Sequence, residues 1–292
     1  MTTTFAAISQ RIELLKTWLT PRVTPEQQAW LDEQAGRVEE AKGGPALVMA
    51  IGMAPRKLGK ADLGLDADEI AAAVELRPGL EPTDWSVDQA ARILFLLASF
   101  NRDEVEFVKR LDTLLATAEV GEQIALLRGI PLYPASPLLV ARAGEGVRSA
   151  MQPVFEAVAH RNPFPREEFN ETQWNQMVLK ALFIGSKLAP IQGLDERRNK
   201  DLAVMLIDYA HERWAAGRAV SPELWRCVGP FAQQSDVDDL ARVLHEGTAM
   251  EQTAAALALS ECSLPNAADA LEAVPAVATG IKQGDVSWRD VP

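Results

Sequence analysis

The chain has 292 residues, and its 29 basic and 41 acidic side chains give a formal net charge of -12. A chain of this length buries about three quarters of the surface that it exposes when unfolded, so its core needs neither disulfides nor a structural metal. The negative charge repels the phosphates of DNA and RNA, which argues against a nucleic-acid partner. Aromatic residues make up only 6% of the chain, which disfavours a β-sandwich or barrel.

The sequence shows no targeting or membrane signal. No basic stretch precedes the first apolar residues, and no segment approaches the roughly 18 apolar residues of a membrane span, so we expect a cytoplasmic protein that does not cross the membrane. Cys227 and Cys262 lack the spacing of a zinc site or a disulfide framework, and we expect both to be buried thiols. No motif predicts a cofactor.

Helical periodicity runs along the whole chain and predicts an all-α fold of many stacked helices. Residues 5–19 place Ile8, Ile12, Leu15 and Leu19 on one face, and Thr24 followed by Pro25 opens the next helix. Ser86 and Gln89 have the spacing of a capping box, and the apolar run 93–97 predicts that the helix they open is central. Further helices are expected at 66–76, 103–118, 121–128, 137–160, 171–184, 199–216 and 222–232.

The last third predicts paired helices. Segments 224–232 and 237–244 resemble segments 255–262 and 267–274 with an offset of about 30 residues, in the range of helical solenoids. The alternative, two similar amphipathic hairpins, is equally favoured, and either gives a stack of HEAT-like character. The end, 284–292, is polar and is expected to be a loosely attached tail carrying Trp288.

Charge and chain breaks predict three segments. A Gly-Gly-Pro break ends an N-terminal helical segment, 1–44. A central helical core is expected over 45–226. Within it, residues 121–226 are nearly neutral and hold most of the versatile side chains, so a ligand site is expected there. The remaining segment, 227–292, is acidic.

Within helix 199–216, three carboxylates share one stripe beside His211, namely Asp201, Asp208 and Glu212. Such ligands suit a metal, but the sequence lacks the second histidine of H-E-x-x-H, and a solvated acidic stripe is favoured. His160 offers a ligand or base, yet it also ends a helix before Pro163, where a cation meets the helix dipole favourably.

Two further features remain open between a site and ordinary surface. In helix 171–184 the residues Gln173, Gln176 and Lys180 form a narrow polar line, which borders either a cleft or solvent. The loop 55–62 carries Arg56, Lys57 and Lys60, which form either an anion or partner patch or, as is favoured, a solvated loop. Its glycine spacing does not match a nucleotide-binding loop, and no catalytic motif stands out elsewhere.

Seven strings resemble the EboA family and span most of residues 45–260. They are PRKLGKAD (55–62), WSVDQAAR (85–92), AHRNP (159–163), WNQMVLKALF (174–183), PIQGLDER (190–197), DYAHERW (208–214) and SPELWRCVG (221–229). The resemblance implies an all-helical protein from a bacterial gene cluster that handles a secondary metabolite. Its companions there resemble a prenyltransferase, a TatD-type hydrolase, a sugar-phosphate-isomerase-like barrel and a dehydroquinate-synthase-like enzyme, and their attributed role is metabolite traffic, including export of a pigment precursor in cyanobacteria.

Two functions follow as hypotheses. The favoured one is a noncatalytic binding or scaffold protein that holds a small metabolite or docks a companion enzyme. Its expected binding residues are His160, Arg161, Asn162, Trp174, Asn175, Lys180, Gln192, Asp195, Arg197, Asp208, His211, Arg213 and Trp214. The alternative is a metal-assisted hydrolase or isomerase that uses His160, Asp195, Asp208 and His211.

Overall fold

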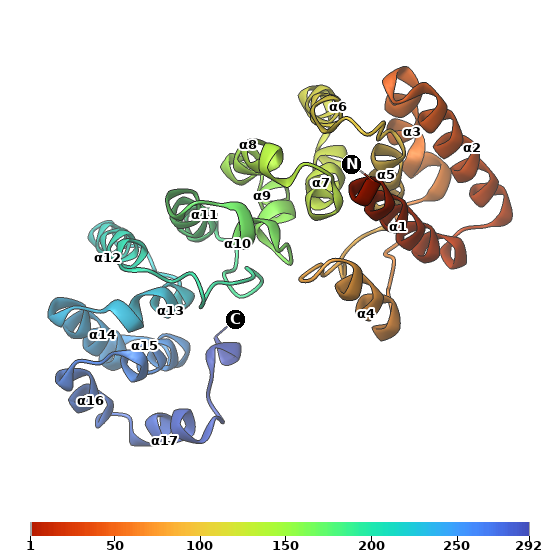
Figure 1. The fold of residues 1–292 in the computed structure, drawn as a ribbon. Coiled ribbons are helices and arrows are strands. Elements are labelled where there is room, and N and C mark those ends of the chain that lie inside the picture. The colour runs from red at the N-terminus through yellow and green to blue at the C-terminus, as the bar shows by residue number, and fades with distance from the viewer. Residues whose placement is uncertain (1, 292) are drawn as a thin grey trace. The chain divides into compact units, whose positions relative to one another are not determined.

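The computed structural model describes residues 2–291, which form helices, turns and loops. The only pairing of extended backbone in this range is an isolated bridge between Asp62 and Ser86, so the all-α prediction is confirmed. The chain forms two compact units, residues 1–170 and residues 171–292 (Figure 1). The boundaries expected after residues 44 and 226 fall inside these units and stay predictions.

The first unit contains ten α-helices and two 3-10 turns within its described part. They are α1 (Thr2–Leu19), η1 (Thr20–Arg22), α2 (Pro25–Ala41), α3 (Gly44–Leu58), α4 (Ala67–Leu76), α5 (Val87–Ala98), α6 (Glu104–Thr117), α7 (Val120–Arg128), η2 (Ile130–Leu132), α8 (Ser136–Arg148), α9 (Gln152–Ala159) and α10 (Phe164–Glu168).

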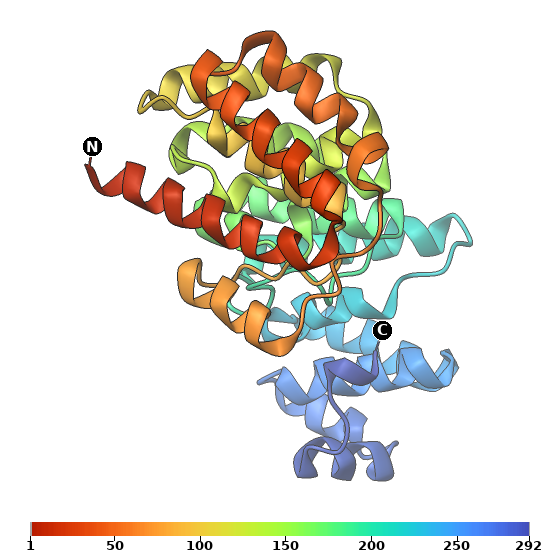
Figure 2. The same cartoon turned by 90° about the vertical axis from the view of Figure 1, so that its right-hand side faces the viewer.

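Helix α5 is the centre of this unit. Its residues 87–97, apart from Gln89, are buried, including the apolar run 93–97 that predicted a central helix. Helices α1, α2, α3 and α7 pack around it, and α4 lies alongside α1 (Figure 2). The predicted capping box at its start is present, with the Ser86 amide donating to the Gln89 side chain at 3.2 Å.

One charged pair lies inside this core. Arg92 is 1% exposed and donates to Asp88, one turn earlier on α5, at 3.1 Å. Its Nε also donates to the Ile51 carbonyl at 3.1 Å, which ties α3 to α5. A buried charge is tolerated only when it is paired and hydrogen-bonded. Asp88 supplies the charge partner of Arg92, and the Ile51 carbonyl supplies a hydrogen-bond acceptor from α3.

The second unit contains seven α-helices and three 3-10 turns within its described part. They are α11 (Glu171–Ile184), α12 (Lys200–Ala215), η3 (Pro222–Leu224), α13 (Trp225–Val228), η4 (Gly229–Phe231), α14 (Gln234–Glu246), α15 (Ala249–Glu261), α16 (Pro265–Leu271), α17 (Pro275–Gln283) and η5 (Trp288–Asp290). Helix α15 is the core of its later part and packs against α13, α14, α16 and α17. The HEAT-like character expected for this part stays a prediction.

Two expectations about helices and one about a cysteine were wrong. The single helix expected at 137–160 is two helices, because the extended backbone at Met151 and Pro153 in the first turn of α9 prevent continuation. The helix expected at 222–232 is a succession of 3-10 and α turns, with Pro222 as the first residue of η3 and Pro230 as the second residue of η4. Cys262 is only half-buried, although Cys227 is buried as expected.

The expected loose tail, 284–292, is anchored over its described residues 284–291. The indole N–H of Trp288 donates to Glu261 at 2.7 Å, and Val291 is 1% exposed. One buried apolar side chain and one charge-assisted hydrogen bond hold this segment against its own unit. Across residues 2–291, no helix combines the length and the hydrophobicity that a membrane crossing requires.

Candidate functional site

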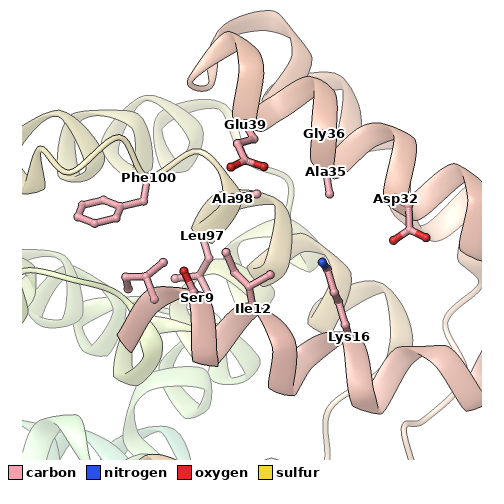
Figure 3. A pocket seen from close by; sticks show the side chains of 11 residues that line it. Ser9, Ile12, Lys16, Asp32, Ala35, Gly36, Glu39, Leu97, Ala98 and Phe100 are labelled. Carbon is pink, nitrogen blue, oxygen red and sulfur yellow. The ribbon is translucent and has the colours of Figure 1, made fainter. Parts of the chain in front are cut away.

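A cavity of about 260 Å³ opens between α1, α2 and the end of α5, within the first unit (Figure 3). Its wall from α1 is Ile8, Ser9, Ile12 and Lys16; its wall from α2 is Asp32, Ala35, Gly36 and Glu39; and its wall from the end of α5 and beyond is Leu97, Ala98 and Phe100. Apolar side chains therefore form the floor, while charged side chains come from the two outer helices. This combination is typical of small-molecule sites.

The cavity exists because two neighbouring helices both rest on a third. Helices α1 and α2 pack more extensively on α5 than on each other. The lining residues of α2 recur at intervals of three and four positions, from Asp32 through Gly36 to Glu39, so they share one helical face. Because Ala35 and Gly36 are small, the space between α1 and α2 is left unfilled at this level.

Gly36 is unusual because it lies in the middle of a long helix. A glycine at such a position destabilises a helix by about 0.5–1 kcal/mol relative to alanine. A Cβ built on Gly36 would meet no atom within 4 Å, so close packing inside the protein does not require a glycine there. The missing side chain keeps the wall of the cavity open.

The charged groups of the cavity differ in their partners. Lys16 pairs with Glu13 on its own helix at 3.1 Å, and Asp32 accepts a hydrogen bond from Gln28 at 3.1 Å. Within the described residues, the Glu39 carboxylate has no hydrogen bond or ion pair. Figure 3 shows it pointing down from α2 over Ala98, with Lys16 and Asp32 toward the other end.

A second hollow, of about 430 Å³, lies among α15, α16 and α17 in the second unit. Its lining is largely apolar, with Glu272 and Lys282 as its charged members. Helix α17, which forms one wall, contributes no buried side chain, so this wall is weakly held by packing. We therefore regard the cavity beside α5 as the better formed site.

The expected binding residues of the first unit lie in the turn between α9 and α10. His160 is the residue that follows α9, as predicted for a helix end. Asn162 is buried; its side chain accepts from the Phe164 amide at 3.0 Å and donates to a carbonyl of α9 at 3.3 Å. Arg161 adopts a positive φ of 48° and lies 3.6 Å from Glu81. The Asn162 side chain thus holds the turn itself, whereas the Arg161 side chain faces an acidic residue of the segment between α4 and α5.

The other ten expected binding residues belong to the second unit, and most contact one another or their helices. Asn175 is buried and exchanges hydrogen bonds with Asn199 at 2.8 and 3.1 Å, which joins α11 to the start of α12. The guanidinium of Arg197 lies 4.6 Å from the ring centre of Trp174, whose own side chain is fully buried. Asn175 and Trp174 are thus parts of the core.

Asp195 lies in a cluster of ion pairs that closes the loop between α11 and α12. Arg226 donates to both of its carboxylate oxygens, at 2.8 and 2.7 Å. This hydrogen bonding outweighs partial burial and lowers the pKa of Asp195. Arg198, 3.8 Å from Asp195, also pairs with Glu261, so the loop is joined to α13 and α15.

His211 and Trp214 belong to a layered cluster on α12. The ring of Trp214 stacks on buried Trp225, with 5.7 Å between the ring centres. The guanidinium of Arg242 lies over the Trp214 ring, 3.9 Å from its centre. His211 contacts Asp239 of α14 at 2.5 Å. The cluster holds α12 against α13 and α14, since aromatic stacking and cation–π contacts each favour a fixed spacing.

The remaining residues of this group have separate surroundings. Arg213 donates two hydrogen bonds to the Ala219 carbonyl, at 2.9 and 2.7 Å, and so closes the turn after α12. Lys180 lies 5.6 Å from the ring centre of Phe183, which is 70% exposed. Gln192 lies half-buried in the loop before α12. In the polar line of α11, Gln176 is exposed, as the solvent alternative predicts.

The expected loop of cations, 55–62, is partly helix. Arg56 and Lys57 form the last turn of α3, and Lys60 follows it; all three are exposed. Cations in the last turn of a helix are stabilised by the helix dipole. The positions of Arg56 and Lys57 therefore need no bound anion to explain them. The backbone carbonyl of Lys57 accepts from Gln27 of α2 at 3.0 Å.

The alternative metal site would use four residues, His160, Asp195, Asp208 and His211, which are not grouped as metal ligands in the described part of the chain. His160 lies in the first unit and the other three lie in the second. There, Asp195 and His211 have different partners, while Asp208 is exposed on α12. Throughout residues 2–291, no three His, Cys, Asp or Glu side chains are grouped so as to hold a metal ion. The stripe of Asp201, Asp208 and Glu212 is exposed, as the solvated interpretation predicts.

Sequence reasoning did not find the cavity, although a signal for it exists. The periodicity of residues 5–19 identified the face containing Ile8 and Ile12, but as core. Gly36 interrupts an otherwise strongly helical segment, and such a glycine indicates either close packing or a functional gap. Only coordinates distinguish these two, because the first fills the space beside the glycine and the second leaves it open.

Comparison of the sequence with models of protein families identifies the family of this all-α protein. The sequence model of the family described as "Metabolite traffic protein EboA" matches residues 11–229, which is most of the chain. The protein belongs to the EboA family. Neither the curated proteins nor the solved structures contain a match. Apart from Ile8 and Ser9, every residue lining the cavity beside α5 lies within the matched segment.

Proposed function

We propose that this protein is a noncatalytic binding protein of a metabolite traffic pathway and that it holds a small metabolite in the cavity between α1, α2 and α5. The family description supports the pathway. The open wall at Gly36 is the observation that carries the binding site, because it gives up helix stability without relieving any close contact. The floor of Ile8 and Leu97 supplies apolar contact, and the rim supplies polar groups.

The contacts of the charged side chains in the cavity support binding. A general base or nucleophile acts through a partner within hydrogen-bonding reach that orients it. In the cavity, Lys16 and Asp32 have partners only on their own helices, and neither partner lines the cavity. Binding without bond making is the simplest function for such a site, and the hydrolase or isomerase alternative stays a prediction without support here.

Docking of a companion enzyme is a second candidate function. Phe183 on α11 and Val204 on α12 are 70% and 51% exposed, and large exposed apolar side chains are common at protein contacts. We expect tagged protein to copurify with companion proteins of its gene cluster, such as the prenyltransferase-like or TatD-like members. Phe183→Ser should reduce that recovery, whereas serine in place of exposed Val105, in the first unit, should not.

The metabolite proposal is tested by blocking the cavity. Protein produced together with its gene neighbours is purified and denatured, and the small molecules released are compared by untargeted mass spectrometry. Gly36→Leu should remove the retained compound, because the leucine side chain enters the empty space beside α2. Ala29→Leu is the matched control, since it adds the same side chain to α2 at an exposed position outside the cavity.

Two results would count against the proposal. One is a wild-type protein that releases no compound above the level seen with an unrelated helical protein. The other is a Gly36→Leu variant that folds, as judged by circular dichroism and thermal unfolding, yet retains the same compound in the same amount as the Ala29→Leu control.

A further inference from the structure

We infer that the cavity between α1, α2 and α5 selects a small, positively charged amphiphile, whose cationic nitrogen is held by Glu39 and whose apolar body lies on Ile12, Leu97 and Phe100. This inference rests on the proposed function, and it names the chemical class of the ligand. It follows from the size of the cavity, from the charges around it and from their arrangement along it.

Size sets the first limit. The cavity of about 260 Å³ has room for about nine water molecules at roughly 30 Å³ each. A ligand that fills it therefore has on the order of ten non-hydrogen atoms, the bulk of one substituted ring. Nucleotides and polycyclic compounds are larger than this space and would extend from its open side into solvent.

Charge sets the second limit. Three ionisable side chains line the cavity, one basic and two acidic. The positive charge of Lys16 is already matched by Glu13 at 3.1 Å. Asp32 accepts a hydrogen bond from Gln28, whereas no described residue donates to the side-chain carboxylate of Glu39, which is exposed. A bound anion would meet surplus negative charge, while a bound cation would supply the partner that the Glu39 carboxylate lacks.

Arrangement sets the third. Asp32 and Glu39 are seven residues apart on α2, which places them about 10 Å apart along the helix with Gly36 between them. Figure 3 shows Glu39 at the end of the cavity where Ala98 and Phe100 lie. A ligand of the stated size thus places its cation at Glu39 and its apolar part along the floor, where Gly36 leaves room for it.

Two probes of equal shape test this class. 2-Phenylethylamine is protonated at neutral pH, and 2-phenylethanol replaces its ammonium by a hydroxyl group. Each is titrated into wild-type protein, Glu39→Gln and Glu40→Gln, and the amide signal of Gly36 is followed by two-dimensional NMR. Glu40 is an exposed neighbour on α2 that does not line the cavity, so its substitution removes the same charge as a control.

We expect the amine to bind wild-type protein about fivefold tighter than the alcohol, because a partly exposed ion pair contributes modestly. The preference should vanish in Glu39→Gln, persist in Glu40→Gln and weaken as salt is added. Equal binding of the two probes to wild-type protein, or a preference that survives in Glu39→Gln, would overturn the inferred class. The release experiment with Gly36→Leu does not depend on these probes. It therefore tests the proposed function separately from the ligand class inferred here. Absence of any shift at Gly36 with both probes would also overturn the inferred class.

Discussion

Removal of the Glu223 carboxylate should loosen the loop between α11 and α12. This side chain is 5% exposed and accepts from the Leu188 amide with both oxygens at 3.0 Å and from the Ala189 amide at 2.8 Å. It thereby holds two consecutive backbone N–H groups that no helix or strand satisfies. The contact spans 35 residues of sequence, from the loop to η3.

Glu223→Ala leaves these donors in unequal situations. Leu188 is fully buried, so its amide loses its acceptor without access to water, which costs about 1–3 kcal/mol. Ala189 is exposed, so water replaces most of what its amide loses. Removing the desolvation penalty of the buried carboxylate offsets part of the loss. We expect a net destabilisation of about 2 kcal/mol, and a smaller one for Glu223→Gln, which keeps one acceptor oxygen.

The assay combines denaturant unfolding with amide hydrogen exchange. Exchange at Leu188 should accelerate in Glu223→Ala far more than at amides in the middle of α15, because the lost contact is local. Glu212→Ala, at an exposed position of α12, is the matched control and should change the unfolding free energy by less than about 0.5 kcal/mol. If Glu223→Ala were as mild as this control and left Leu188 protected, the reasoning would be refuted.

Three further changes have defined outcomes. Gly36→Ala should raise the unfolding free energy by about 0.5–1 kcal/mol in a thermal or denaturant melt, because its Cβ meets open space; a destabilised variant would show that the glycine serves packing. Burial raises the pKa of Cys227 to about 12, so at pH 8 a thiol reagent should label half-buried Cys262 and spare Cys227 until the protein unfolds, and equal labelling rates in the folded protein would contradict this. The Arg226 hydrogen bonds lower the pKa of Asp195 in the folded protein. The ion pair therefore stabilises the fold above the unfolded pKa of about 3.9, and this stabilisation is lost as the pH falls through the lower folded pKa. Asp195→Asn should therefore lower stability at pH 7 by less than about 1 kcal/mol and flatten the acid end of the stability profile; unchanged acid sensitivity would argue against the pair.

The sequence by itself determined the class of fold and the local signals within it. The helix start at Thr24 and Pro25 and the capping box of Ser86 with Gln89 are confirmed, because such signals join residues close together in sequence. The burial of residues 93–97 and the exposure of the acidic stripe on α12 followed from periodicity alone. Seven matching strings also indicated the family that the comparison shows.

Only the tertiary structure decided where space and partners lie. Asn175 is polar in sequence but buried in the protein, because Asn199 satisfies it from 24 residues away. Glu223 finds its backbone donors at a distance of 35 residues, and the cavity beside Gly36 requires α1, α2 and α5 to meet. Periodicity assigns a residue to a face of its own helix, but which helix covers that face, and whether the two fit closely, depends on packing between segments distant in sequence.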